Sequence, residues 1–209
     1  MNKEELAEQY PLTFSLIADK DIPVYHTICL ADGWLKLVEK MSNELSEQFP
    51  DIRYRQVKEK FGKLRVYYTG HTEENRREVN FIVDKYEYMS RDVCETCGGP
   101  GLSRGGSWLR VLCDEHNVNN QPVKDSRIRW TPDSHDRTHK GILLEHLGDG
   151  HLANVIRFMK EENGYGDYHI YLFETEANRR GLSESFLNTE HPHNDEYELE
   201  YVHKNNFKR

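Results

Sequence analysis

Three stretches of the chain repeat their hydrophobic residues with the period of an α-helix. The first follows Asp32, a residue type that caps helices, ends at Pro50 and consists of Trp34, Leu37, Val38, Met41 and Leu45. The second follows Thr72 and the third follows Asp149; their residues are Val79, Ile82, Val83 and Tyr86, and Leu152, Val155, Ile156 and Met159. The spacing i, i+3, i+4, i+7 predicts an amphipathic helix in each stretch, with one buried face.

Residues 51–70, between the first two predicted helices, have the composition of strands. The segment is rich in Tyr, Val and charged residues, and we predict two strands, about 52–60 and 64–69, joined at Phe61-Gly62. The segment 168–182 is ambiguous, because its aromatic residues favour a strand and its second half favours a helix closed by Gly181. The first twenty residues predict a short helix or a docked arm.

Composition limits the size of the core and the classes of function. Leu, Ile, Val and Phe make up 48 of 209 residues, just above the ~20% level below which disorder is expected. No run of 18 apolar residues is present, so we expect no membrane span, and acidic residues near the start argue against a secretory signal. Four cysteines without a secreted-type framework indicate a reducing compartment, the cytoplasm by default.

Charge is distributed unevenly along the chain. The formal net charge of −8 argues against a protein coated with cations for binding nucleic acid. Residues 51–70 nevertheless carry six cations against two acids, whereas residues 184–200 carry six acids and no Lys or Arg. The six cations are candidate nucleic-acid contacts: Arg53, Arg55, Lys58, Lys60, Lys63 and Arg65. The alternative is a half-solvated strand pair whose cations face water and whose aromatic residues pack on a helix.

The strongest chemical signal is Cys94-x2-Cys97-x15-Cys113-x2-His116. Tetrahedral zinc takes four thiolate or imidazole ligands, and ligands two residues apart bind it from one tight turn. The glycines of 98–101 suit such a turn, 107–112 is strand-like, and acids after Cys113 suit a helix start, which together predict a treble-clef-like module. Buried free cysteines, an iron site or a redox pair are the alternatives. Four protein ligands leave no position for water, so we predict structural Zn²⁺.

Two catalytic functions are the alternatives to a structural zinc. Nucleases built on treble clefs carry a catalytic His on the hairpin between the ligand pairs, but residues 98–112 contain no His, Asp or Asn. A metal-dependent hydrolase could use His135, Asp136 and His139, because His residues four apart share one face of a helix. The alternative for these residues is a polar surface loop in a protein with eleven His.

Two parts of the chain resemble protein families. Residues 31–116 carry DGW at 32–34, QVKEKFG at 56–62 followed by LR, and the zinc run CETCGGPG…WLRVLCDEH, and they resemble a family of uncharacterised phage and bacterial proteins. Residues 147–182 carry HLANVI at 151–156 and EANRRGL at 176–182, and they resemble a small phage-encoded module, from which the His-rich stretch 131–146 departs. The resemblance implies the four zinc ligands and a phage-type accessory protein, and it implies no catalytic residue.

Together these observations predict an α+β protein. We expect an α+β domain over 1–116, with helix, hairpin, helix and a zinc module at about 92–120, then a linker over 117–130 and a small, mostly helical module with an acidic end over 131–209. The expected function is a zinc-stabilised, non-catalytic accessory protein of the cytoplasm that binds a host or phage macromolecule, with a protein partner favoured. Nucleic-acid binding through 53–65 and the hydrolase reading are the alternatives.

Overall fold

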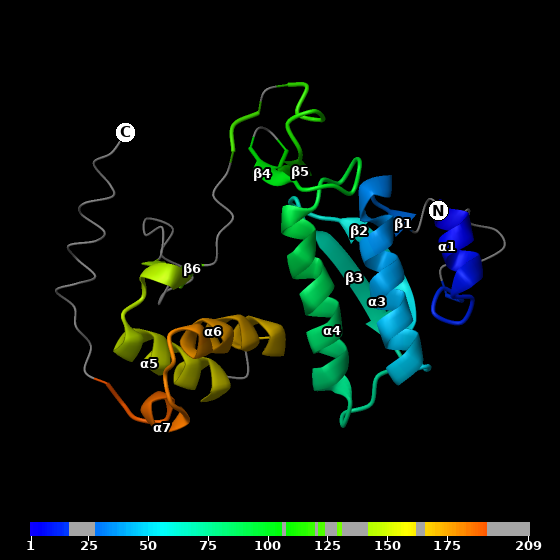
Figure 1. Ribbon diagram of the computed structural model, residues 1–209. Coiled ribbons are helices and arrows are strands. Elements are labelled where there is room, and N and C mark those ends of the chain that lie inside the picture. The colour runs from blue at the N-terminus through cyan, green and yellow to red at the C-terminus, as the bar shows by residue number, and fades with distance from the viewer. Residues whose placement is uncertain are drawn as a thin grey trace. The chain divides into compact units, whose positions relative to one another are not determined.

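The computed structural model is an α+β protein with two compact units, Met1–Ser126 (unit 1) and Arg127–Arg209 (unit 2) (Figure 1). It describes residues 1–16, 28–105, 108–119, 121–123, 129–130, 142–161 and 166–191. The division between the units falls within 117–130, and each unit has its own hydrophobic core. No helix among the described residues is both long and apolar enough to cross a membrane.

Unit 1 contains a three-stranded sheet in the order β1-β2-β3. Strands β2 (Arg53–Glu59) and β3 (Leu64–Thr69) are antiparallel, and β1 (Ile28–Cys29) runs parallel to β2. The predicted hairpin is therefore confirmed to within a residue at each end. Its turn has positive φ at both central residues, 55° at Phe61 and 70° at Gly62, which is the geometry of a type I′ turn that matches the twist of the strands.

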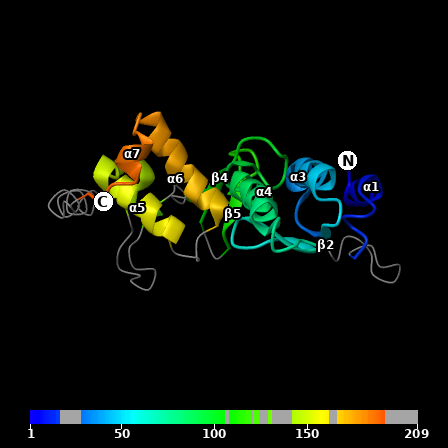
Figure 2. The same ribbon diagram turned by 90° about the horizontal axis from the view of Figure 1, so that it is seen from below.

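Helices cover one face of this sheet. Helix α3 (Leu35–Gln48), which is preceded by the 3₁₀ turn η1 (Asp32–Trp34), and helix α4 (Arg76–Met89) lie side by side on it (Figures 1 and 2). Helix α1 (Lys3–Gln9) adds Leu6 to the same core. The hydrophobic positions that predicted α3 and α4 are all buried, which confirms both helices.

A β-bulge determines which residues of β2 face the helices. Register shifts between Tyr54 and Gln56, so Arg55 is an extra residue. Tyr54 and Val57, three positions apart, are consequently both buried. No described element covers the opposite face, where Arg55 and Tyr67 are exposed.

Two side chains, one in the last turn of α4 and one directly after it, close the outer edge of β3. The backbone N–H of Val66 donates to Glu87 Oε1 at 2.8 Å, and that of Leu64 donates to Ser90 Oγ at 2.9 Å. Burial raises the pKa of Glu87, although the Val66 N–H and Arg65 both favour its carboxylate. These acceptors satisfy strand N–H groups that would otherwise be available for pairing with another chain.

Unit 2 is mostly helical. The strands β6 (Arg129–Trp130) and β7 (Ile142–Leu143) pair, and η3 (Leu144–His146), α5 (Asp149–Glu161), α6 (Asp167–Arg179) and α7 (Glu184–Leu187) follow. The segment 168–182, which was ambiguous in sequence, is thus helical over most of its length. It ends in a Schellman motif: Gly181 has φ 73°, and the N–H of Leu182 donates to the carbonyl of Ala177 at 3.1 Å.

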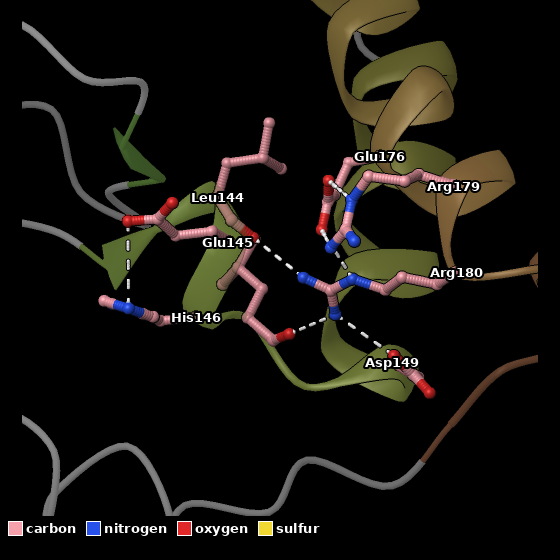
Figure 3. Close-up of polar contacts among 8 residues, drawn as sticks. Leu144, Glu145, His146, Asp149, Glu176, Arg179 and Arg180 are labelled. Atoms are coloured by element: carbon pink, nitrogen blue, oxygen red, sulfur yellow. Dashed lines mark hydrogen bonds and ion pairs between the residues drawn. The ribbon is translucent and has the colours of Figure 1, made fainter.

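Arg180 connects the end of α6 to η3 and the start of α5 (Figure 3). Its guanidinium donates to the carbonyl oxygens of Leu144 and Leu147, to Asp149 Oδ1 at 3.0 Å and to Glu176 Oε1 at 2.8 Å. The side chain is only 14% exposed, so a planar donor with several fixed N–H groups is required here. The arginines of the EANRRGL motif therefore have a structural role in this unit.

Candidate metal centre

The first two candidate ligands lie on a knuckle that follows α4. The 3₁₀ turn η2 (Ser90–Asp92) leads into it, and the N–H of Gly98 donates to the Cys94 carbonyl at 2.9 Å. The N–H of Cys94 in turn donates to the Gly99 carbonyl at 2.7 Å. Gly98 has φ 76°, a conformation that side chains with a Cβ rarely adopt. Gly98 therefore has the role in folding the knuckle that the sequence predicted for the glycines of 98–101.

The beginning of the first predicted helix packs directly against the knuckle. The N–H of Gly33 donates to the Glu95 carbonyl at 2.9 Å, and a Cβ at Gly33 would lie 2.3 Å from the Cys94 carbonyl oxygen. The indole N–H of the fully buried Trp34 donates to the Val93 carbonyl at 2.8 Å. The DGW stretch therefore positions the first ligand pair.

The other ligand pair follows a short hairpin. Strands β4 (Leu102–Arg104) and β5 (Arg110–Leu112) are antiparallel. The Arg110 guanidinium forms an ion pair with the buried carboxylate of Glu95. Residues 114–116 form a turn, with the N–H of Asn117 donating to the Asp114 carbonyl at 3.3 Å. The expected helix start is therefore absent from the described residues 113–119, so the likeness to a treble clef extends to the knuckle and the hairpin only.

The four predicted ligands come together with the spacing of a metal site. The donor atoms of Cys94, Cys97, Cys113 and His116 all lie within 4.8 Å of one another. Cys97 Sγ is 3.9 Å from Cys113 Sγ, and Cys94 Sγ is 3.8 Å from His116 Nδ1. Tetrahedral Zn–S bonds of about 2.3 Å place sulfur ligands about 3.8 Å apart, so these separations fit zinc. The Cys113 Sγ to His116 Nδ1 separation is shorter, 3.0 Å.

Electrostatics make a cation necessary if all three thiols are to ionise. Burial opposes ionisation of Cys94, but backbone N–H groups of Cys113, Cys97 and Thr96 outweigh it and lower the pKa of Cys94 to about 6. The Gly99 N–H favours the Cys97 thiolate, yet the neighbouring Cys94 and Cys113 sulfurs raise the pKa of Cys97. Several thiolates this close repel one another, and a divalent ion removes that repulsion.

The six basic candidates of 53–65 divide into two groups. Arg53 donates to the carbonyl oxygens of Pro50 and Ile52, and Arg65 pairs with Glu87. Lys63 is partly buried; burial, then Arg91 and Arg65, lower its pKa to about 8. The remaining three lie on or beside the uncovered sheet face and form no ion pair within the described part of the chain: Arg55, Lys58 and Lys60.

The hydrolase candidates His135, Asp136 and His139 lie outside the described residues. Among the residues that are described, the Cys94 cluster is the one group of three or more His, Cys, Asp or Glu side chains close enough to hold a metal.

Sequence reasoning missed three residues that build the metal centre. Gly33 provides the close approach to the knuckle, Glu95 binds Arg110, and the half-buried Glu59 joins the two hairpins by accepting from the Gly62 N–H and, at 3.3 Å, from the Trp108 indole. All three lie in the stretches that carry the family resemblance: Gly33 in DGW, Glu59 in QVKEKFG and Glu95 in CETCGGPG.

Comparison with known proteins adds no identity. No protein-family model matches the sequence, and neither curated proteins nor solved structures show a significant match to it.

Proposed function

We propose that this chain is a zinc-stabilised binding protein without a catalytic centre, an accessory protein of the phage type that the resemblance implies. The observation that carries the proposal is the donor set at Cys94, Cys97, Cys113 and His116. Three sulfurs and one imidazole at these separations complete a tetrahedron, so no position is left for a water or a substrate. The ion then contributes folding free energy and no chemistry.

The surroundings of the cluster support a structural ion. The knuckle is anchored to α3 by Gly33 and Trp34, and the β4–β5 hairpin is anchored to the knuckle by Glu95 and Arg110. An ion that fixes these three segments rigidifies the end of unit 1 where the β2–β3 turn and Trp108 lie. A cluster of three cysteine ligands lasts where thiols stay reduced, which supports the cytoplasm as the compartment.

Exposed aromatic side chains beside the zinc module support a role in binding. Trp108 is 61% exposed and Phe61 is 69% exposed, so neither contributes much to the core. Large aromatic residues held on a rigid support are the usual anchors of macromolecular interfaces. The sequence favours a protein partner, with nucleic acid as the alternative.

Metal analysis of the purified full chain tests the proposal. We expect one zinc per chain in the wild type, less than a tenth of that in Cys97→Ser, and one in the control Cys29→Ser, which alters the cysteine outside the cluster. X-ray absorption should show three sulfurs and one nitrogen around zinc. An oxygen in the coordination shell, or a fully folded chain that binds no metal, contradicts the proposal.

A further inference from the structure

We propose that the uncovered face of the unit 1 sheet binds single-stranded nucleic acid. This inference rests on the proposed function, because it names the partner of the surface next to the zinc module. The surface, here termed the basic-aromatic strip, extends from the middle of the sheet across the hairpin turn to the zinc module; it consists of Arg55, Lys58, Tyr67, Lys60, Phe61 and Trp108.

Lys58 and Tyr67 lie on the uncovered face of the hairpin, and Trp108 lies at its turn end, where the indole donates to Glu59. Val57 and Val66, which pair across β2 and β3, are buried under the helices, so their neighbours Lys58 and Tyr67 point to the opposite face. Lys58 Nζ lies 5.0 Å from the Tyr67 ring centre. A depression of about 560 Å³ lies beside Tyr67 and Arg55. The strip thus has both a flat ring and an open space at its centre.

The aromatic side chains of the basic-aromatic strip are largely exposed, and one of them has a strained backbone. Tyr67 is 45% exposed, and Phe61 and Trp108 are exposed more. Phe61 also has a φ of 55°, although type I′ turns favour Asn or Gly at this position because a large side chain is strained there. A strained residue with most of its side chain in solvent is not explained by folding, and binding sites are where such strain persists.

Each ring of the hairpin is accompanied by a cation. Lys60 Nζ lies 5.5 Å from the Phe61 ring centre, and Lys58 Nζ lies 5.0 Å from the Tyr67 ring centre. Alternating rings and cations match the alternation of bases and phosphates, since bases stack on exposed rings and phosphates pair with the cations beside them. An acidic polypeptide matches the cations but has no flat group for each ring.

Charge is segregated in unit 1 in favour of a polyanion at the strip. The strands β2 and β3 carry four cations and a single acid, Glu59, and that carboxylate accepts from Gly62 and Trp108. The helices α1, α3 and α4 carry nine acids and six cations, so the two strands are more positive than the helical layer. A duplex presents only its phosphates to a flat surface, because its bases are stacked inside. The exposed rings therefore favour a single strand.

Fluorescence anisotropy of the zinc-loaded full chain with a labelled 20-mer of deoxythymidine tests the inference. We expect binding at 50 mM salt that is at least tenfold tighter than binding to a duplex of equal length. Three phosphate contacts predict a slope of about −2 in log K against log salt, which weakens binding roughly 15-fold at 200 mM. The double variant Arg55→Gln/Lys58→Gln should lose at least tenfold in affinity and reduce the slope.

Matched variants separate charge from stacking. Lys36→Gln/Lys40→Gln makes the same charge change on exposed residues of α3 and should retain affinity within twofold. Phe61→Asn should weaken binding at least fivefold while raising the urea midpoint, because it removes the strained ring. Zinc content must stay at one per chain in all variants, so a failure here is distinct from a failure of the proposed function.

The inference is overturned by any of these results: no binding to single strands at 50 mM salt, equal losses in the Lys36/Lys40 control, or equal affinity for single strands and duplex. Polyglutamate that binds as tightly as the oligonucleotide also overturns it, in favour of an acidic protein partner.

Discussion

At the scale of single residues, the metal centre depends on a glycine that is not a ligand. Gly33 allows the entry to α3 to touch the knuckle, where an added Cβ would lie 2.6 Å from the Gly98 nitrogen as well as against the Cys94 carbonyl. Both neighbours are backbone atoms held by hydrogen bonds, so they cannot move aside without disturbing the ligands. Gly33→Ala should therefore lower the free energy of unfolding of unit 1 by about 2–3 kcal/mol and speed zinc transfer to a chelator.

Urea unfolding and the rate of zinc release measure this effect. Gly148→Ala is the matched control, because nothing lies within 4 Å of a Cβ at that position. It should change stability by less than about 0.5 kcal/mol and leave zinc release unchanged. Wild-type values for Gly33→Ala would mean that the contact between α3 and the knuckle does not hold the ligands.

Residues whose signal is local were predictable, and residues whose partners are distant along the chain were not. The spacing of Cys94, Cys97, Cys113 and His116 indicated one cluster, because ligand pairs on tight turns have a fixed local pattern, and the donor atoms do come together. Gly33 and Glu87 carry no such pattern, since their roles depend on a knuckle and a strand edge contributed by other parts of the chain. The hydrolase site expected at His135 and His139 stays a prediction, because both residues lie outside the described part of the chain.

At the scale of elements, local propensity was sufficient where a helix has a regular hydrophobic face. The periodic positions of α3, α4 and α5 are buried as the spacing predicted. For α6 the local signals conflicted, and packing decided: Phe173 and Ala177, four residues apart, are buried against Leu152, Val155 and Ile156 of α5. The two-residue β1 had no sequence signal, because it exists by pairing with β2.

The C-terminal end of α6 makes unit 2 sensitive to acid. Hydrogen bonds from Arg179, partly offset by burial and reinforced by Arg180, lower the pKa of Glu176 to about 2 (Figure 3). Because this pKa lies below that of the unfolded chain, near 4.5, the stabilising contribution is complete above about pH 5 and is lost as pH falls toward 2. The side chain is 12% exposed, and we expect a loss on the order of 2 kcal/mol.

Hydrogen exchange of the peptide 167–182, corrected for intrinsic rates, measures this loss at pH 6 and pH 3. Glu176→Gln should be less stable than the wild type at pH 6, and the difference should shrink at pH 3 without disappearing. At pH 3 the carboxyl is protonated in the unfolded chain, whereas its pKa of about 2 keeps most of the folded chain ionised. Glu174→Gln is the control, since Glu174 pairs with Lys160 near the surface and is 34% exposed. A difference between Glu176→Gln and the wild type that stays constant with pH would show that the clamp does not depend on the ionised carboxylate.

At the scale of the whole molecule, two separate cores predict two separate responses to metal removal. The cluster and all its anchoring contacts lie within unit 1, and the core of unit 2 consists of residues after 143. A chelator should therefore lower hydrogen-exchange protection more than 100-fold across 93–116, with a smaller loss at the start of α3 through Gly33 and Trp34. Protection of α5 and α6 should stay within twofold, because these helices are buried in a core formed by residues of unit 2.

Cysteine variants make the test specific for the cluster rather than for the chelator. Zinc-supplied Cys113→Ser should reproduce the exchange pattern of the chelated wild type, and Cys29→Ser should match the zinc-loaded wild type before chelation and the chelated wild type after it. Parallel loss of protection in α5 and α6 would show that the two units fold as one. Unchanged protection across 93–116 would contradict a structural role of zinc. A site closed by four protein ligands has no open position for chemistry, so stabilisation of the fold is the role that we propose for the ion.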